Sequence, residues 1–354
     1  MRVRHLGKVV VGILLMLNCS VNVVVVGLNR SMWDEPVALL VANLSVGDVL
    51  FGFMMVVIGL ADVVFPPPVP QPVCVTLQYL VLGTSWQVKS AQLLVALDML
   101  IAVVLPLHYH QVMDDWLKPM LIAPWIMMLI NLLIGVVCSS LQLENTYEYG
   151  LKHGWLNEVG TDCRWELLPS VYSFIWEGGL FVMSTISGII FIYASLVGVR
   201  QRRAIEERGE SGTASSAFFL RRFKSMYKIA KVIILFIALD IIGAGMRVSA
   251  RWYYIPLVST AIHFVRIVSL GAETWVYGMN NVSLRRAFDT FCQEHLGFLG
   301  FARQVQPEQL MMRAFSVSKR PSLEGGRSVK RPSDNSWRHP DLQLDEVCDS
   351  RSRH

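Results

Sequence analysis

CVTLQYLVLGTSWQVKSAQLLVALDMLIAVVLPLHY, residues 74–109, is the stretch that decides the fold. Its apolar part is longer than the ~20 residues that a helix needs to cross a ~30 Å hydrocarbon core. Cys74 opens the stretch, Lys89 and Asp98 interrupt it, and Pro106 and Tyr109 lie just past its apolar part. Backbone groups in lipid must bond within their own segment, so a membrane-spanning helix is the economical interpretation.

Apolar runs of comparable length recur along the 354-residue chain, which is 53% hydrophobic and 17% charged. A soluble protein of this size carries about 25% charged residues. The sequence therefore predicts an all-α membrane protein, a bundle of seven transmembrane helices. We place the spans at residues 9–28, 37–60, 74–105, 120–140, 171–199, 229–246 and 254–278.

Positive residues in the loops predict the orientation of the chain in the membrane. The segment between the fifth and sixth spans is rich in Arg and Lys, and so is the region after the seventh span. Both are expected in the cytoplasm, which places the N-terminus outside a plasma membrane. Arg2, Arg4 and Lys8 argue the other way, and we interpret the first span as a signal anchor. The expected organisation is an extracellular N-terminus (1–8), a transmembrane domain (9–278), an amphipathic cytoplasmic helix (279–302) and a disordered tail (303–354).

Six cysteines are scattered without the spacing of a metal site. Cys74 opens the third span and Cys163 lies in the loop before the fifth, both on the oxidising side, so we expect them to form a disulfide. Cys19 and Cys138 fall inside spans and are expected as small apolar fillers. Cys292 lies in the amphipathic segment and is either a palmitoylation site or an inert thiol.

The spans carry anchor residues that together resemble rhodopsin-like (class A) G-protein-coupled receptors. Beside the cysteine, Asp and Pro-Leu-x-Tyr pattern of residues 74–109, the matching anchors are Asn22, Asn43 with Asp48, Trp125, Tyr193, Phe236 and Tyr277. The resemblance implies the same disulfide, a small-molecule ligand and a heterotrimeric G protein. It also implies a receptor embedded in a lipid bilayer, with no enzyme activity and no nucleic-acid partner. The tail repeats Lys-Arg-Pro-Ser, ending at Ser322 and Ser333. These serines suit phosphorylation that would recruit an arrestin-like partner, and a merely solvated tail is the alternative.

Short strings narrow the resemblance to odorant receptors of the divergent fish and amphibian type. Pro-Leu-His-Tyr-His follows the third span, and Tyr277-Gly278-Met279 ends the seventh. A chemosensory role in olfaction is therefore our finer expectation. A retinal-binding opsin would need a lysine where Ile267 stands, and the chain has no nucleophile motif, phosphate-binding loop or metal cluster, so neither a catalytic residue nor a cofactor is expected.

The switch elements of the family depart from its pattern in this chain. Met99 follows Asp98 where the family has an arginine that reaches the G protein, and Met can neither pair with a carboxylate nor donate a hydrogen bond. Asp240 lies in the sixth-span motif that has lost its proline, and Thr185 stands at the fifth-span proline position. Glu273 stands where the seventh-span motif has an asparagine. The alternative function is therefore a receptor-like protein that does not signal, such as a decoy, scaffold or heteromer partner.

Ionisable residues inside the spans are costly and mark functional sites by default. They are Asp48, Lys89, Asp98, Glu177, Asp240, Arg266 and Glu273. The resemblance places Glu177, His263 and Arg266 at the outer ligand cavity and Asp240 at its floor, where Asp240 and Arg266 either contact ligand or form a packing ion pair. It places Asp48 and Glu273 at a sodium site. For Lys89 we expect a salt bridge inside the bundle, and the buried charges also leave a proton-coupled transporter as a third interpretation.

Overall fold

The structure of the chain is a computed structural model. It divides into two units, Met1–Ala302 and Arg303–His354, and the second lies wholly outside the described residues. The described residues are 2–64, 71–106, 108–145, 148, 152, 163, 167–207, 233–243, 245, 269, 271–273, 276 and 282–295.

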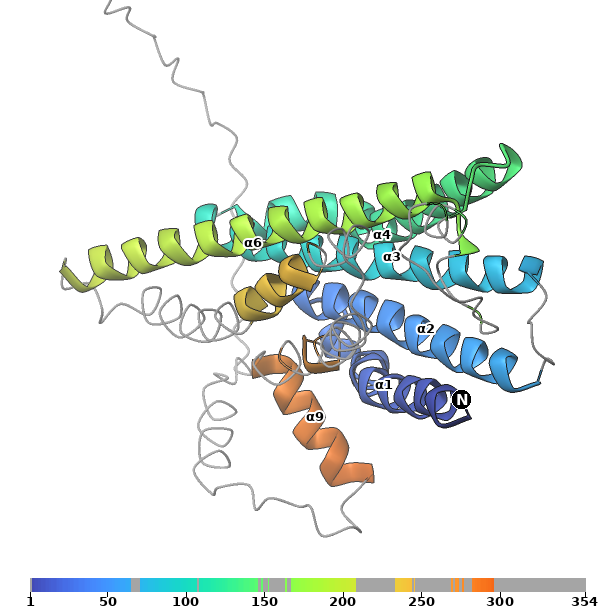
Figure 1. Cartoon of the computed structure of the whole chain (residues 1–354). Coiled ribbons are helices and arrows are strands. Elements are labelled where there is room, and N and C mark those ends of the chain that lie inside the picture. The colour runs from blue at the N-terminus through green and yellow to red at the C-terminus, as the bar shows by residue number, and fades with distance from the viewer. Residues whose placement is uncertain are drawn as a thin grey trace, which may run out of the picture. The chain divides into compact units, whose positions relative to one another are not determined.

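Five helices of the described residues are long and apolar enough to cross a membrane. They are α1 (Arg2–Leu28), α2 (Pro36–Val64), α3 (Gln71–Val104), α4 (Tyr109–Ser140) and α6 (Ser170–Glu207), shown in Figure 1. They correspond to the first five predicted spans. The sixth predicted span contains the helix Ile233–Gly243, and the described residues 271–273 of the seventh are also helical. Short elements complete the described part: a 3₁₀ helix, η1 (Arg30–Met32), an isolated bridge between Asn145 and Pro169, and α9 (Val282–His295).

Three helices extend beyond the apolar runs that predicted them. α1 begins at Arg2, so residues that we expected as an extracellular tail belong to the first helix. α4 begins at Tyr109, well before its apolar core. α6 continues to Glu207, eight residues beyond the predicted end at 199, because Arg, Gln, Ala and Glu favour helix even where hydropathy falls.

Close backbone contact joins α1 to α2. A Cβ atom added to Gly12 would lie 2.7 Å from the carbonyl oxygen of Gly52, and one added to Gly52 would lie 2.9 Å from that of Gly12. Only glycine permits this approach, as at other small-residue helix contacts in membranes. α3 packs against α2, α4 and α6 and is the central helix of the described bundle.

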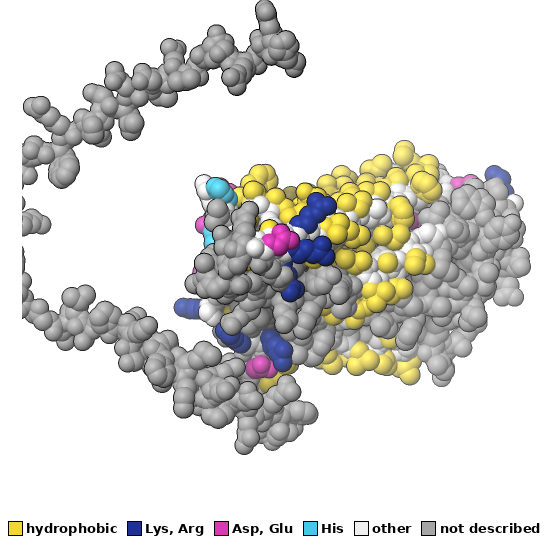
Figure 2. Space-filling model, turned by 90° about the vertical axis from the view of Figure 1, so that its left-hand side faces the viewer, with side chains coloured by type: hydrophobic (Ala, Val, Ile, Leu, Met, Phe, Trp, Pro, Cys, Tyr) yellow, Lys and Arg dark blue, Asp and Glu magenta, His cyan; other side chains and the backbone are white. Residues whose placement is uncertain are grey.

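Apolar side chains cover the outside of the bundle. Figure 2 shows hydrophobic side chains gathered across one face of the molecule. On α4 the exposed large aliphatic residues are Ile122, Ile126, Leu129, Ile130, Leu133, Val136 and Val137. A soluble protein rarely exposes so much contiguous apolar surface, whereas lipid tails solvate it at no cost.

The amphipathic helix predicted after the seventh span is α9. Leu284 and Ala287 are buried, while Arg285 and Arg286 are exposed. One apolar face and one basic face are typical of a helix that lies on a membrane surface.

Candidate functional site

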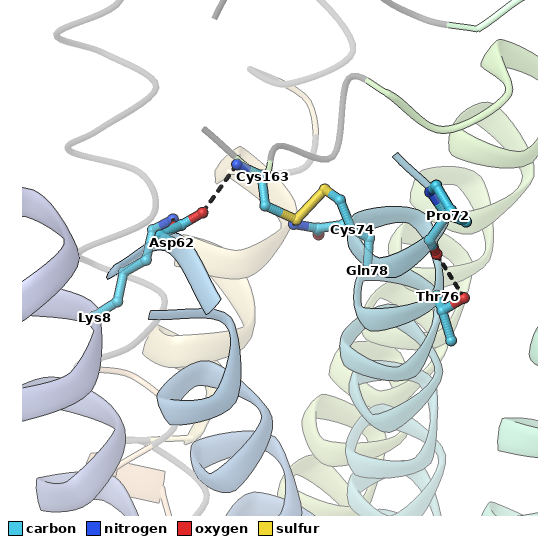
Figure 3. Close-up of a disulfide and its surroundings, with 7 residues drawn as sticks. All are labelled: Lys8, Asp62, Pro72, Cys74, Thr76, Gln78 and Cys163. Atoms are coloured by element: carbon cyan, nitrogen blue, oxygen red, sulfur yellow. Dashed lines mark hydrogen bonds and ion pairs between the residues drawn. A yellow bond between two sulfur atoms is a disulfide. The ribbon is translucent and has the colours of Figure 1, made fainter. Parts of the chain in front are cut away.

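The predicted disulfide between Cys74 and Cys163 is present (Figure 3). It joins the fourth residue of α3 to the loop before α6, and both half-cystines are buried. The amide of Gln78, one turn further along α3, donates to the sulfur of Cys163 at 3.6 Å. The prediction of this disulfide is confirmed.

A second attachment holds the same loop to α2 and α1. The carboxylate of Asp62 accepts the backbone N–H of Cys163 at 3.0 Å through one oxygen and pairs with the ammonium of Lys8 at 2.7 Å through the other (Figure 3). We call Lys8, Asp62 and the disulfide the outer clamp. Sequence reasoning missed Asp62, although antiparallel first and second spans bring the start of one beside the end of the other. The clamp therefore gathers one end of α1, α2 and α3 around the loop.

Aromatic residues fill the space between α3, α4 and α6. The indole N–H of Trp86 donates to the carbonyl of Trp176 at 3.3 Å, and the indole N–H of Trp176 donates to the carbonyl of Leu82 at 3.0 Å. One turn before Trp176 on α6, the Tyr172 hydroxyl donates to Asn131 of α4 at 2.7 Å. These residues are part of the buried core.

Glu177, a predicted ligand contact, lies on α6 beside this aromatic cluster. Its side chain is 1% exposed, whereas Phe174, three residues earlier, is 58% exposed. Glu177 therefore faces the interior of the bundle and Phe174 faces the apolar exterior. His263 and Arg266, the other predicted contacts of the outer cavity, lie outside the described residues.

A buried charge cluster lies at the centre of the bundle. The ammonium of Lys89 on α3 pairs with Asp240 of the helix Ile233–Gly243, and the two side chains are 3% and 9% exposed. The same ammonium donates to the Gln92 amide oxygen at 2.9 Å, and the Gln92 amide nitrogen donates to Glu273 at 3.0 Å. We call Lys89, Gln92, Asp240 and Glu273 the central cluster. It confirms the salt bridge predicted for Lys89 and supplies Asp240 with a partner that the sequence did not identify.

Asp48, which the sequence places in a sodium site with Glu273, is buried on α2, and Glu273 is equally buried. Among the residues that the structure describes, no group of three or more His, Cys, Asp or Glu side chains could hold a metal ion. The pairing of Asp48 and Glu273 around a cation stays a prediction.

The helix-four tryptophan ties α4 to α2. The indole N–H of Trp125 donates to the Asn43 side-chain oxygen at 2.9 Å, and the Asn43 amide donates to the carbonyl of Leu121 at 3.0 Å. Gln87 of α3 donates to the backbone carbonyl of Asn43 at 3.3 Å. Three helices thus meet at one asparagine, which fixes their relative rotation near the predicted inner half of the bundle.

Near the end of α3 opposite the disulfide, a tyrosine engages the acid of the expected arginine switch. The Tyr109 hydroxyl, at the first turn of α4, donates to Asp98 of α3 at 2.7 Å. Met99 is 6% exposed and belongs to the main apolar cluster of the bundle. Of the other predicted switch residues, Tyr193 is exposed on α6 and Phe236 is half-buried. Tyr277 lies outside the described residues.

Cys292, the predicted palmitoylation site, lies half-buried on α9. Burial raises the pKa of its thiol, and the charge of Asp289 raises this pKa further. The thiol is therefore protonated at neutral pH and a weak nucleophile. Cys19 and Cys138, expected as apolar fillers, are both buried.

With this geometry established, the comparison with known families is decisive. Residues 17–244 match the family described as 7 transmembrane receptor (rhodopsin family). The chain belongs to this family. Its fold is accordingly the seven-transmembrane helix bundle, and its family is one of receptors, whose general partners are ligands and G proteins. No curated protein matches the chain at a significant level.

Proposed function

We propose that this chain is a plasma-membrane receptor that binds a small polar ligand in the outer half of the bundle and signals to a G protein through movement of its sixth span. The observation that carries the proposal is the buried pair between Lys89 and Asp240. It ties the central helix α3 to the helix that must move. An intramembrane ion pair persists only where it serves function or packing, since each charge alone is costly in lipid.

The proposed ligand is polar or zwitterionic, because the residues assigned to the cavity are charged. Glu177, Asp240, His263 and Arg266 are the proposed contacts. The inward-facing, buried position of Glu177 on α6 supports this assignment. A positively charged group of the ligand near Glu177 would give up its water and contact the carboxylate. The attraction between the two charges is strong there because the local dielectric constant is low.

We propose that the N-terminus is extracellular and the tail cytoplasmic. The outer clamp supports this orientation because Lys8, near the start of α1, lies at the same end of the bundle as the disulfide. Disulfides persist on the oxidising side of a membrane. The basic end of α6, with Arg200, Arg202 and Arg203, then lies on the cytoplasmic side, as the positive-inside rule requires.

Finer features of the proposal rest on the sequence. The chemosensory, odorant-type assignment rests on the strings after the third and seventh spans. Recruitment of an arrestin-like protein would follow phosphorylation of Ser322 and Ser333, and palmitoylation of Cys292 would anchor α9 at the membrane. A sodium ion between Asp48 and Glu273 is likewise expected only from the resemblance to the receptor family.

The experiment is a panel of amino acids, amines and small carboxylic acids applied to cells that express the full chain. G-protein activation and arrestin recruitment are both recorded. A compound that activates the wild type should lose potency by at least tenfold with Glu177→Gln at unchanged surface expression. Val182→Ala, an exposed position on the same helix, is the matched control and should respond as the wild type. An equal response from all three proteins would contradict the assignment of Glu177.

A second candidate function is a receptor-like protein that does not activate G proteins. The specific observation in its favour is Met99, which is buried among apolar residues where the family has its arginine. A thioether cannot donate a hydrogen bond to a G protein. The Tyr109 hydroxyl meanwhile engages Asp98, so the acid has a local partner without the arginine.

Met99→Arg separates the two candidates. If the chain binds ligand but cannot couple, the arginine should create or increase G-protein turnover in the presence of a panel compound that recruits arrestin. A wild type that already activates G protein would refute the second candidate. A wild type that is silent towards the whole panel in both assays would refute the first.

A further inference from the structure

The family expectation of a sodium ion at the bundle centre can be tested against the donors and acceptors found there. A hard cation is held by oxygen ligands. In the central cluster, the Gln92 amide oxygen accepts from the Lys89 ammonium at 2.9 Å, and an oxygen of Glu273 accepts from the Gln92 amide at 3.0 Å. One oxygen of Asp240 pairs with the same ammonium. Nitrogen donors therefore already engage these oxygens.

The charge of the cluster also disfavours a second cation. Lys89 is 3% exposed, so its positive charge is held in a site from which water is excluded. Like charges repel strongly there, because the local dielectric constant is far below that of water. Glu273 is joined to Lys89 through a single residue, Gln92. The donor set of the described cluster does not fit a bound sodium ion.

We infer that the Lys89 ammonium is the resident cation of the central cluster and stands where the family resemblance would bring a sodium ion to Glu273. It differs from a diffusible ion in one respect. It is covalently tethered to α3, so its contacts with Asp240 and, through Gln92, with Glu273 hold the sixth and seventh spans at any salt concentration. The inference does not rest on signalling, since a silent receptor would hold the same cluster.

Thermal unfolding of the purified full chain tests the inference with inorganic salts alone. The midpoint Tm is measured in sodium chloride, potassium chloride and N-methylglucamine chloride at equal ionic strength, which keeps screening constant. We expect the same Tm in all three salts. A Tm that rises along a saturation curve with sodium alone, and does so no longer in Glu273→Gln, would overturn the inference, because a ligand of the folded state stabilises it in this manner.

Lys89→Met shows whether the ammonium is the reason for sodium insensitivity. The substitution releases oxygens of Gln92 and Asp240, so this variant should acquire a sodium-specific rise in Tm. Lys118→Met removes an exposed lysine from α4 and should stay insensitive. A Lys89→Met protein that is as insensitive as the wild type would overturn the inference, since the site would then be absent for another reason.

A second variant covers the case in which Lys89→Met does not fold. Lys89→Met/Asp240→Asn removes both charges of the pair and leaves Gln92 and Glu273 in place. Its Tm is measured in the same three salts. A sodium-specific rise in Tm supports the tethered cation, and a Tm that is the same in all three salts contradicts it. Should neither variant fold, the wild-type comparison decides alone, because sodium sensitivity of the wild type refutes the inference and insensitivity supports it.

Discussion

Removing one partner of the Lys89–Asp240 pair should destabilise the receptor strongly. The two side chains are 3% and 9% exposed, so water cannot solvate the charge that is left behind. Breaking a buried pair from one side costs about 3–5 kcal/mol, whereas an exposed pair contributes about 0–1 kcal/mol. We therefore expect Lys89→Met to lower the free energy of unfolding by about 3–5 kcal/mol, which lowers Tm by on the order of 10 °C.

Removing both charges should restore most of the lost stability. A buried ion pair replaced by apolar residues of similar volume is often neutral, because the desolvation cost of both charges disappears. We expect Lys89→Met/Asp240→Leu to unfold nearer to the wild type than either single variant. The assay is a double-mutant cycle on the purified full chain, read by thermal unfolding. The coupling free energy should be at least about 3 kcal/mol, because two single losses of about 3–5 kcal/mol each combine to less than one of them.

Additive losses in the free energy of unfolding would refute this reasoning. If the double variant loses the sum of the two single losses, the charges do not depend on each other and the pair does not join α3 to the sixth span. Lys118→Met is the matched control for loss of a lysine, because Lys118 is exposed on α4. It should change the free energy of unfolding by less than about 0.5 kcal/mol.

Three further substitutions test the packing and the outer clamp. Gly12→Ala should destabilise the bundle by about 1–3 kcal/mol in thermal unfolding, because its Cβ would lie 2.7 Å from the carbonyl oxygen of Gly52. Asp62→Asn should weaken the hold on the outer loop by about 1–2 kcal/mol, so a water-soluble phosphine should reduce the outer disulfide at least fivefold faster. Trp176→Phe removes the indole donor to Leu82 and should cost about 1–3 kcal/mol in the same unfolding assay.

Each of these substitutions has a control elsewhere in the chain. Gly27→Ala meets nothing within 4 Å and should be neutral or stabilising. Asp34→Asn and Trp116→Phe change exposed residues and should leave the reduction rate and Tm unchanged. If Gly27→Ala lowers the Tm as much as Gly12→Ala, the close contact between Gly12 and Gly52 is contradicted. Equal reduction rates for Asp62→Asn and Asp34→Asn would contradict the role of Asp62. An unchanged Tm for Trp176→Phe would contradict the hydrogen bond from Trp176 to Leu82.

The sequence predicted the helices and the disulfide because both follow from simple physical constraints. A single chain segment can satisfy its own backbone in lipid only as a helix, so a long apolar run marks each span almost without regard to tertiary contacts. Cys74 and Cys163 were the two cysteines expected on the oxidising side, which left little choice of partner. Helix ends were predicted less well. Hydropathy indicates where a helix leaves the membrane and not where it ends. α6 continues to Glu207 because the polar residues beyond the membrane boundary also favour helix.

The partners of the buried charges could not be read from the sequence. The sequence offered Asp240 only Arg266 as an ion-pair partner and named no partner for Lys89. The pairing depends on how the third, sixth and seventh helices are rotated about their axes. Hydropathy gives no rotation for a helix that is apolar on most sides. The Asp62 contact was missed for a related reason, since it needs the register between α1 and α2 and the path of a loop.

The central claim is that the Lys89–Asp240 pair holds the movable sixth span against α3. The most direct test is a distance distribution from spin labels at Leu105→Cys and Leu235→Cys, two exposed positions, with Cys292 and Cys348 replaced by serine. We predict one narrow distribution for the otherwise wild-type receptor and an added longer-distance population in Asp240→Asn. Identical distributions in the two proteins would contradict the claim.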